Sequence, residues 1–470
     1  VLCIFVFKKS SIVTGITALI ITGCLVMLPS FNSNTFHISY PFIKGSLTTL
    51  SIAYILLLGI FLFQLMEQAG AIQGLANAIK SATPDPFYQI LLLVLGFSPL
   101  IESISGFGLA VIIIAPILLA LGIAPKKAAL LALISLCIIP WGTLSMGTII
   151  GATLSYLELE DLGVWSAIVS LPLYVYIAFL AISIGIGWKT ACKRWRAIVC
   201  YGLVLGGAVL GCNIWISVEL AGIFGAFVLM GTIFMRIRKS LKIEIRSLMY
   251  FLTPYILLIF LLFCSRTIPD VQQFLMEHGN WTVEAFQYSF ATFYSPGFFL
   301  IIISVFTIFL YKLDVKQISA SAWQTWEKCM PILLTTFLYI CVAELMTAAN
   351  MITILSMTIA SLIGPSFLYI SPVIGAMGGF LTGSNTASNT MLIRLQTETA
   401  NYVGINKVHV AAAQNVSSSF STMVNPSKIA LSCSVCNISN KENIVQMKML
   451  KIGCATIGFI MIILGCIQYI

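Results

Sequence analysis

Long apolar runs, most of them the length of a membrane-spanning helix, occupy most of this chain and are separated by short polar stretches. The runs that we expect to cross a membrane lie at 11–29, 45–66, 128–156, 164–187, 197–212, 216–235, 249–264, 296–311, 330–348, 408–432 and 450–470. The polar stretches are too short to form a separate soluble domain. This pattern predicts an all-α polytopic membrane protein.

Two polar, glycine-bearing segments interrupt apolar sequence at matching positions. They read Gly96-Phe97-Ser98-Pro99-Leu100-Ile101-Glu102-Ser103-Ile104-Ser105-Gly106-Phe107-Gly108 and Gly379-Phe380-Leu381-Thr382-Gly383-Ser384-Asn385-Thr386-Ala387-Ser388-Asn389-Thr390. Gly96 and Gly379 lie 283 positions apart, and the same offset carries 11–29 onto 294–312 and 45–66 onto 328–349. The chain is therefore predicted to contain a duplication. Paired interruptions of this kind indicate half-helices that meet near the bilayer midplane, where secondary transporters bind their substrates.

The distribution of charge predicts how the chain is threaded. Basic clusters, which favour the cytoplasmic side, lie at Lys8-Lys9, Lys126-Lys127, 189–196 and 236–246, whereas 265–295 is acidic. If both 67–86 and Lys126-Lys127 are cytoplasmic, 87–122 must return to the side from which it came. We expect a re-entrant helical hairpin there, with two arms of about a dozen residues each, too short to span the bilayer.

The same count of crossings places the second repeat in the opposite orientation, with a hairpin around 367–400 that enters from outside. The fold class is thus a set of inverted-topology repeats with two re-entrant hairpins. The spans that follow the hairpins are expected to break at Pro140-Trp141-Gly142 and Asn425-Pro426, because proline removes a helical hydrogen bond. The predicted domains are 1–9, the tail of a truncated N-terminal span; 10–156, the first transport repeat; 157–292, linking transmembrane helices; 293–439, the second, inverted repeat; and 440–470, a C-terminal span.

Composition changes this picture little. Hydrophobic residues make up 59% of the chain and charged residues 9%, and the mean hydropathy is +1.02, so a lipid bilayer is the expected surrounding. The net charge of +9 comes from loops that set orientation, and nucleic acid is not an expected partner. No metal or cofactor is expected, because Cys433 and Cys436 form a lone CxxC pair and the chain has 3 histidines.

Glu102 and the doubled Ser-Asn-Thr of the second break are the main candidates for chemistry. A carboxyl within the membrane is costly unless it is paired, hydrated or protonated, which makes Glu102 a candidate proton carrier; the alternative is a hydrogen-bonded structural acid. The free N–H groups at a helix start after Gly383 favour an anion. The plainer interpretation is that Ser384, Asn385 and Thr386 cap a helix and join neighbouring spans.

The segment from Asn415 to Thr422 is unusually polar for a span and is expected to face a cavity. Lys428, six positions beyond it, is a candidate partner for a substrate carboxylate or reaches the cytoplasmic interface instead. The candidate substrate-binding residues are Ser105, Gly106, Gly383, Ser384, Asn385, Thr386, Ser388, Asn389, Asn415, Ser418 and Lys428.

At these breaks the chain resembles the lactate permease family of proton-coupled monocarboxylate transporters. Residues 101–108 are similar to that family's E-G-A-A-G-F-G, 380–389 to its F-L-T-G-S-D-T-S-S-N, and 423–430 to its M-I-S-P-Q-S-I-A. The resemblance implies transport of a small monocarboxylate such as L-lactate or glycolate across the bacterial inner membrane, by proton symport through Glu102. The chain departs from the family at Asn385, where the pattern has aspartate, and at Thr422, where it has lysine. We therefore infer that both charges of a pair have been lost, and that Lys428 restores part of the positive charge.

Two alternatives stay open at this point. Sodium-coupled carboxylate or dicarboxylate symporters also use Ser-Asn-Thr at their hairpin tips, so sodium could replace the proton as the coupling ion. In those symporters, however, the motif occurs once in each half of the chain. A channel or a membrane enzyme is disfavoured, since neither a continuous pore nor a nucleophile, base or metal set is evident. The sequence leaves the identity of the carboxylate, the stoichiometry and the oligomeric state undetermined.

Overall fold

The computed structural model describes residues 11–28, 39–106, 108–237, 245–286 and 288–467; the predicted tail at 1–9 lies outside them. Within the described ranges, 8 helices are long and apolar enough to cross a membrane, or 9 if the bent pair 125–134 and 139–155 counts as one span. This agrees with the predicted all-α polytopic membrane protein.

The elements up to Gly185 are, in order, α2 (Ser11–Val26), α3 (Ser39–Gln68), α4 (Ala71–Ser81), α5 (Pro86–Leu91), the π-helix η1 (Leu92–Phe97), α6 (Ser98–Ser105), α7 (Leu109–Ala120), α8 (Pro125–Ile134), the 3₁₀-helix η2 (Ile139–Trp141), α9 (Gly142–Ser155) and α10 (Leu159–Gly185). The middle of the chain forms α11 (Trp188–Lys193), α12 (Trp195–Trp215), α13 (Ala221–Ile237), α14 (Ile245–Thr267), α15 (Pro269–Glu277), β1 (Asn280–Val283), η4 (Glu284–Phe286) and β2 (Tyr288–Ala291). The remainder forms α16 (Pro296–Tyr311), α17 (Val315–Ala348), α18 (Met351–Ile363), η5 (Gly364–Ser366), α19 (Phe367–Thr382), α20 (Asn385–Val403), α21 (Lys407–Ser421), η6 (Thr422–Val424), α22 (Pro426–Val435), η7 (Ser439–Lys441) and α23 (Glu442–Ile467).

Helix bounds in the two halves follow the offset of 283 residues seen in the sequence. It carries η2 onto the bounds of η6, and it carries α10 onto 442–468, where α23 runs from Glu442 to Ile467. The agreement therefore extends one helix beyond positions 156 and 439, where we predicted the repeats to end. The division into domains itself stays a prediction.

Two helical hairpins turn at the predicted breaks. In the first, α6 ends at Ser105 and α7 begins at Leu109; in the second, α19 ends at Thr382 and α20 begins at Asn385. Of the two short arms predicted for the first hairpin, the second is confirmed, because α7 has 12 residues, but the first is wrong, because Pro86–Ser105 is a continuous helical stretch of 20 residues. Asp85 caps the start of this stretch and pairs with Arg194 at 2.7 Å, and the stretch is long because it continues through η1 and α6 to Ser105. The re-entrant placement of both hairpins in a bilayer stays a prediction.

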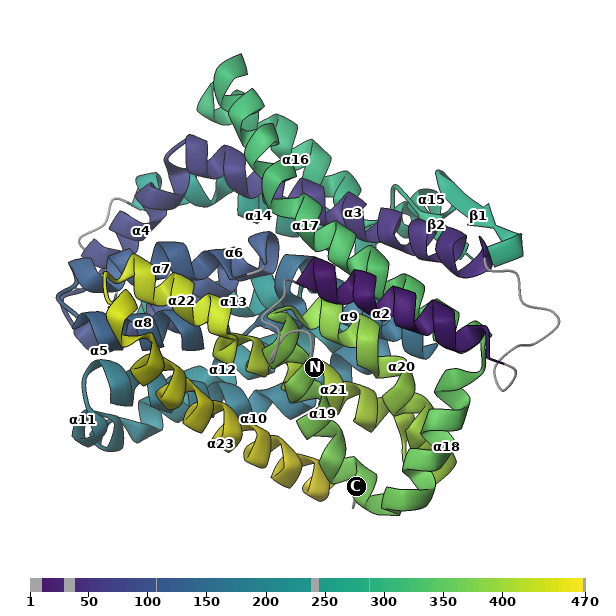
Figure 1. Cartoon of the computed structure of the whole chain (residues 1–470). Coiled ribbons are helices and arrows are strands. Elements are labelled where there is room, and N and C mark those ends of the chain that lie inside the picture. Colours follow the sequence, from purple (N-terminus) through teal and green to yellow (C-terminus); the bar gives the residue numbers. More distant parts are fainter. Residues whose placement is uncertain (1–10, 29–38, 107, 238–244, 287, 468–470) are drawn as a thin grey trace.

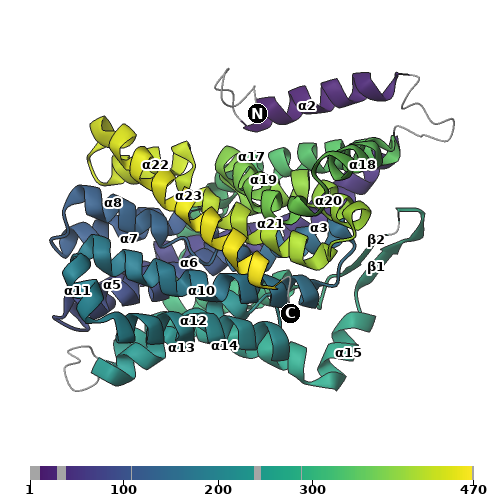
Figure 2. The same ribbon diagram turned by 90° about the horizontal axis from the view of Figure 1, so that it is seen from below.

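The two ends of the molecule are built from different elements. In Figure 1, α5, α8 and α11 lie at one end, and the strands β1 and β2 with α15 lie at the other, and Figure 2 shows the same separation. Figure 2 also places α2 at one edge and α12, α13 and α14 at the opposite edge. The basic segment around α11 and the acidic segment 265–295 thus lie at opposite ends, as the charge pattern predicts.

The segment 265–295 is more ordered than the acidic loop that we predicted. Residues 280–283 and 288–291 pair as an antiparallel hairpin, in register from Asn280 with Ala291 to Val283 with Tyr288. Tyr288 hydrogen-bonds to Ser51 on α3, and Phe286 stacks on Tyr40 with ring centroids 5.1 Å apart. Aromatic side chains therefore hold this hairpin against α3, a long-range contact that the local pattern does not reveal.

Candidate functional site

Four breaks in helices meet around one cavity of about 30 Å³. The breaks are the turns after α6 and α19 and the interruptions between α8 and α9 and between α21 and α22. The lining residues are Glu102, Gly106, Ile139, Gly142, Thr143, Met146, Gly147, Gly383, Ser384, Asn385, Thr386 and Lys428. The two hairpin tips, predicted from sequence to face each other, thus border a shared cavity. Non-helical backbone of this kind is tolerated inside a membrane protein where it is buried or lines such a cavity.

The first tip aims Glu102 at the cavity. Gly106 and Gly108 have φ angles of +62° and +83°, values that side chains disfavour, and a Cβ on Gly106 would lie 1.9 Å from Thr143 Oγ1. This turn brings the Gly108 N–H to Glu102 Oε1, to which it donates at 2.9 Å. Glu102 is 1% exposed, and its Oε2 has no partner among the residues that the structure describes. One carboxyl oxygen is therefore held in place and the other is left available.

The second tip presents the start of α20. Gly383 has φ +66°, and Ser384 caps the helix by accepting from the Ala387 N–H at 3.3 Å. Asn385 is buried, and its Oδ1 has no partner in the described part of the chain. Ser384 therefore caps the helix, as the plainer interpretation predicts. The carbonyl oxygen of the Asn385 side chain is free to contact a ligand.

Among the residues that the structure describes, Lys428 is the one cation that lines this cavity. Asn425 caps α22 by accepting from the Ser427 and Lys428 N–H groups, and Lys428 is 7% exposed. Its Cε lies 3.1 Å from the place where a Cβ on Gly108 would be, so the side chain reaches the tip of the first hairpin. No ion pair joins Lys428 to Glu102 within the described ranges, although both line the same cavity. The interpretation of Lys428 as a cavity residue is favoured over the interfacial one.

The break between α8 and α9 was expected, but its residues were not among the candidates. Thr143, Leu144 and Ser145 all have positive φ (43°, 50° and 67°), a strained run that brings Thr143, Met146 and Gly147 to the cavity. The repeat offers a signal that would have found them. The offset of 283 carries Ser145 onto Lys428, so the segment after the first break corresponds to the one that supplies the cation.

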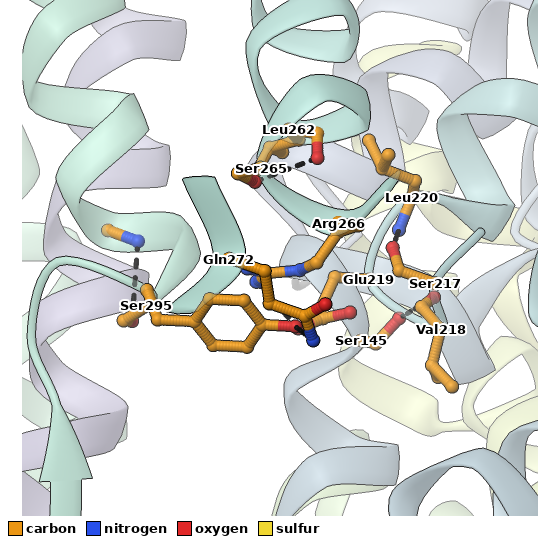
Figure 3. Close-up of polar contacts among 12 residues, drawn as sticks. Ser145, Ser217, Val218, Glu219, Leu220, Leu262, Ser265, Arg266, Gln272 and Ser295 are labelled. Atoms are coloured by element: carbon orange, nitrogen blue, oxygen red, sulfur yellow. Dashed lines mark hydrogen bonds and ion pairs between the residues drawn. The ribbon is translucent and has the colours of Figure 1, made fainter. Parts of the chain in front are cut away.

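A buried polar cluster supports this strained segment from behind. Ser145 Oγ donates to Val218 O at 2.7 Å, next to Glu219, whose Oε1 accepts from Arg266 Nη2 at 3.0 Å (Figure 3). The Arg266 side chain is 3% exposed, and its guanidinium carbon lies 3.6 Å from the centre of the Tyr294 ring. The loop before α13 is therefore fixed, and it holds Ser145 in its left-handed conformation.

Several predicted site residues connect helices instead of lining the cavity. Asn415 Oδ1 accepts from Asn385 Nδ2 at 2.8 Å and from Asn389 Nδ2 at 2.9 Å. Asn415 Nδ2 donates to Thr148 Oγ1 at 3.0 Å and Ser166 Oγ at 2.9 Å. This network joins α20, α21, α9 and α10, and so fixes the helices around the cavity.

The remaining candidates lie close by without reaching the cavity lining. Ser388 accepts from Gln414 Nε2 at 3.1 Å, Ser105 donates to Ile101 O at 2.8 Å, and Ser418 is buried. Thr422 Oγ1 donates to Ser419 O at 2.9 Å, and no hydrogen bond joins Thr422 to Asn385 among the described residues. The inferred loss of a charge pair at these two positions stays a prediction. The cation that shares the cavity with Asn385 is Lys428.

Two larger cavities flank the central one. A cavity of about 490 Å³ shares Gly383, Ser384 and Lys428 with it. Another, of about 230 Å³, shares Met146 and is lined by Tyr288 and other residues of the β hairpin. The narrow centre thus lies between a cavity at the α22 side and one beneath the β hairpin.

Comparison with known proteins places this architecture among membrane transporters. A family model described as L-lactate permease matches residues 1–291 and 256–470. The L-lactate permease of Streptococcus iniae is 26% identical over 382 residues, which cover 77% of this chain and 80% of that protein. The L-lactate permease of Bacillus subtilis (strain 168) is 25% identical over 462 residues, with 84% and 80% covered, and that of Halalkalibacterium halodurans 24% identical over 503 residues, with 98% and 93% covered.

Among solved structures, the crystal structure of the Alcanivorax borkumensis YdaH transporter, described as having an unusual topology, matches with a TM-score of 0.55. It is 12% identical and the match covers 97% of this chain and 98% of that one. At this identity the likeness concerns the fold alone.

Proposed function

The chain belongs to the L-lactate permease family, and we propose that it is a secondary transporter of a small monocarboxylate such as L-lactate or glycolate. As a member of this family with many apolar helices, it is a multi-pass protein of the bacterial plasma membrane. The names of its relatives support L-lactate as the first substrate to test.

The observation that carries the proposal is the cavity at the four helix breaks, with Lys428 as its cation. A buried ammonium has three donors and no acceptor, so a carboxylate is the complementary ligand. The N–H groups at the start of α20 and the Asn385 side chain add polar contacts beside it. A monocarboxylate bound there would place its charge between Lys428 and the second hairpin tip.

Proton symport through Glu102 is the coupling that the site favours. Glu102 is buried in the same cavity, with one oxygen bonded and one free. Entry of a substrate carboxylate beside an ionised Glu102 would place two negative charges together, which is costly away from water. Protonation of Glu102 removes that repulsion, so proton and substrate would bind together.

The arrangement of cavities favours a carrier over a channel. The centre holds about 30 Å³, between cavities of about 490 Å³ and 230 Å³. A narrow centre between two larger cavities suits alternating access, in which one side opens at a time.

Uptake of labelled L-lactate into proteoliposomes, with proton and sodium gradients set independently, tests the proposal. We expect saturable uptake that an inward proton gradient drives uphill, with glycolate competing. Uphill uptake driven by sodium alone would support the sodium-coupled alternative and overturn proton symport. Flux that rises linearly with lactate concentration would overturn the carrier itself.

A further inference from the structure

A further cavity, with both polar and apolar lining residues, lies apart from the transport site, between α8, α10 and α23. It measures about 430 Å³ and is lined by Lys127, Leu130, Leu180, Ser183, Ile184, Lys448, Lys451 and Ile452. The three helices lie side by side in both ribbon views (Figures 1 and 2). They include the pair α10 and α23, which the offset of 283 relates to each other.

The charged side chains that line this cavity are all basic. Lys127, Lys448 and Lys451 line it, and no acidic residue is among its lining residues. Lys127 Nζ donates to Gly185 O at 3.3 Å at the end of α10, next to the lining residue Ile184. Lys448 and Lys451 lie one turn apart on α23 and are both exposed. Three ammonium groups around one hollow are suited to a phosphate-bearing anion.

The rest of the lining is apolar, with one exception. Leu130, Leu180, Ile184 and Ile452 form walls suited to an acyl chain. Ser183 also lines the cavity, and its hydroxyl has no partner among the described residues.

The position along the membrane normal fits a lipid headgroup. The charge pattern predicts that the turn before α8 and the start of α23 are cytoplasmic, and both basic segments lie at the end of the molecule opposite the β hairpin. Lysines would then lie at the level of headgroups, and the apolar walls would extend toward the hydrocarbon. Basic pockets between helices on this side bind anionic headgroups.

We propose that this cavity binds an anionic phospholipid of the cytoplasmic leaflet, with its phosphate among Lys127, Lys448 and Lys451 and an acyl chain along the apolar walls. Such a lipid would join α8 to α10 and α23. The proposal is independent of the substrate and coupling ion of the transporter.

Native mass spectrometry of the delipidated protein, with equal amounts of phosphatidylglycerol and phosphatidylethanolamine added, tests this site. We expect preferential retention of phosphatidylglycerol, and about a hundredfold weaker binding of it in the triple variant Lys127→Gln, Lys448→Gln, Lys451→Gln. A matched control, Lys189→Gln, Lys193→Gln, Arg196→Gln, removes three charges from the same end outside the cavity and should retain the lipid. Ile184→Trp keeps all the charges but fills the apolar wall, and it should also weaken retention.

Three results would overturn the proposal. One is equal retention of the two lipids by the unaltered protein. Another is equal loss in the triple variant and its control, which would mean that general surface charge accounts for binding. The third is stabilisation against heat by inorganic phosphate as large as that by phosphatidylglycerol, which would identify a free-anion site.

Discussion

Glu102 and Lys428 are opposite charges that share one cavity without an ion pair between them within the described ranges. A direct pair would use the lysine donors and exclude an anionic ligand. Here the Gly108 N–H holds Glu102 by one oxygen, and the Lys428 ammonium is left for a carboxylate. In the proposed mechanism, the separation of these two charges would let the cavity bind a substrate anion and a proton together.

Lys428→Gln should weaken substrate binding. A hydrogen bond to a charged group contributes about 1.5–3 kcal/mol, so we expect the half-saturating L-lactate concentration to rise about ten- to hundredfold. Uptake kinetics in proteoliposomes would measure this. Lys189→Gln, on α11 and far from the cavity, is the control and should leave the kinetics unchanged. Equal half-saturating concentrations in the two variants would remove Lys428 from the substrate site.

At the residue scale, sequence reasoning located the cavity but did not separate ligand contacts from helix contacts. Glu102, Asn385 and Lys428 were named from the breaks, and they line the cavity. Asn415 was named too, but its amide binds Thr148 and Ser166, which are 267 and 249 positions away. When the hydrogen-bond partners of a side chain are that distant in sequence, the local sequence pattern does not distinguish a helix contact from a substrate contact.

At the scale of elements, the breaks after α6 and before α9 depend on each other. Gly106 needs its left-handed conformation, and Thr143 fills the space where its Cβ would be. Ser145, two residues further on, is held by Val218 O. The turn of the first hairpin and the kink of the following span therefore form one packed unit.

Gly106→Ala should disrupt this unit. Gly106 has φ +62° and ψ −168°, a combination almost restricted to glycine, so alanine there costs roughly 1–3 kcal/mol, and the contact with Thr143 adds to that. We expect a lower midpoint of thermal unfolding and a loss of transport. Gly207→Ala is a matched control, because a Cβ on that helical glycine meets nothing within 4 Å. If Gly106→Ala were as stable and active as Gly207→Ala, the tight packing of the turn would be refuted.

The elements that sequence reasoning predicted best are those that the repeat duplicates. Hairpin turns and both later breaks lie where the glycine and proline pattern placed them. The β hairpin at 280–291 was missed, because its strands are 4 residues long and aromatic contacts with α3 help to hold it. The first hairpin arm was predicted too short, because the helix continues through Gly96 and Pro99, as η1 and α6, to Ser105.

At the scale of the whole molecule, charge and architecture agree. The ion pair between Asp85 and Arg194 joins two segments that were both predicted to be cytoplasmic. The β hairpin lies at the opposite end, beside one of the two flanking cavities. The same axis thus orders the basic end, the central cavity and the acidic end.

Labelling of single cysteines in a cysteine-free background should report this orientation. Ser289→Cys, exposed on β2, should react with a membrane-impermeant maleimide in intact cells. Lys193→Cys, exposed on α11, should react only after the membrane is permeabilised. Labelling of both positions from the same side would contradict the predicted threading, and with it the inverted repeat.

The most direct test of coupled transport through the central cavity is the uptake of labelled L-lactate by Glu102→Gln in proteoliposomes with an inward proton gradient. The neutral amide mimics the protonated carboxyl but cannot release a proton. The unaltered protein should accumulate lactate above its outside concentration. The variant should show no accumulation while still exchanging internal for external lactate. Accumulation by Glu102→Gln equal to that of the unaltered protein would contradict the assignment of the proton to this cavity.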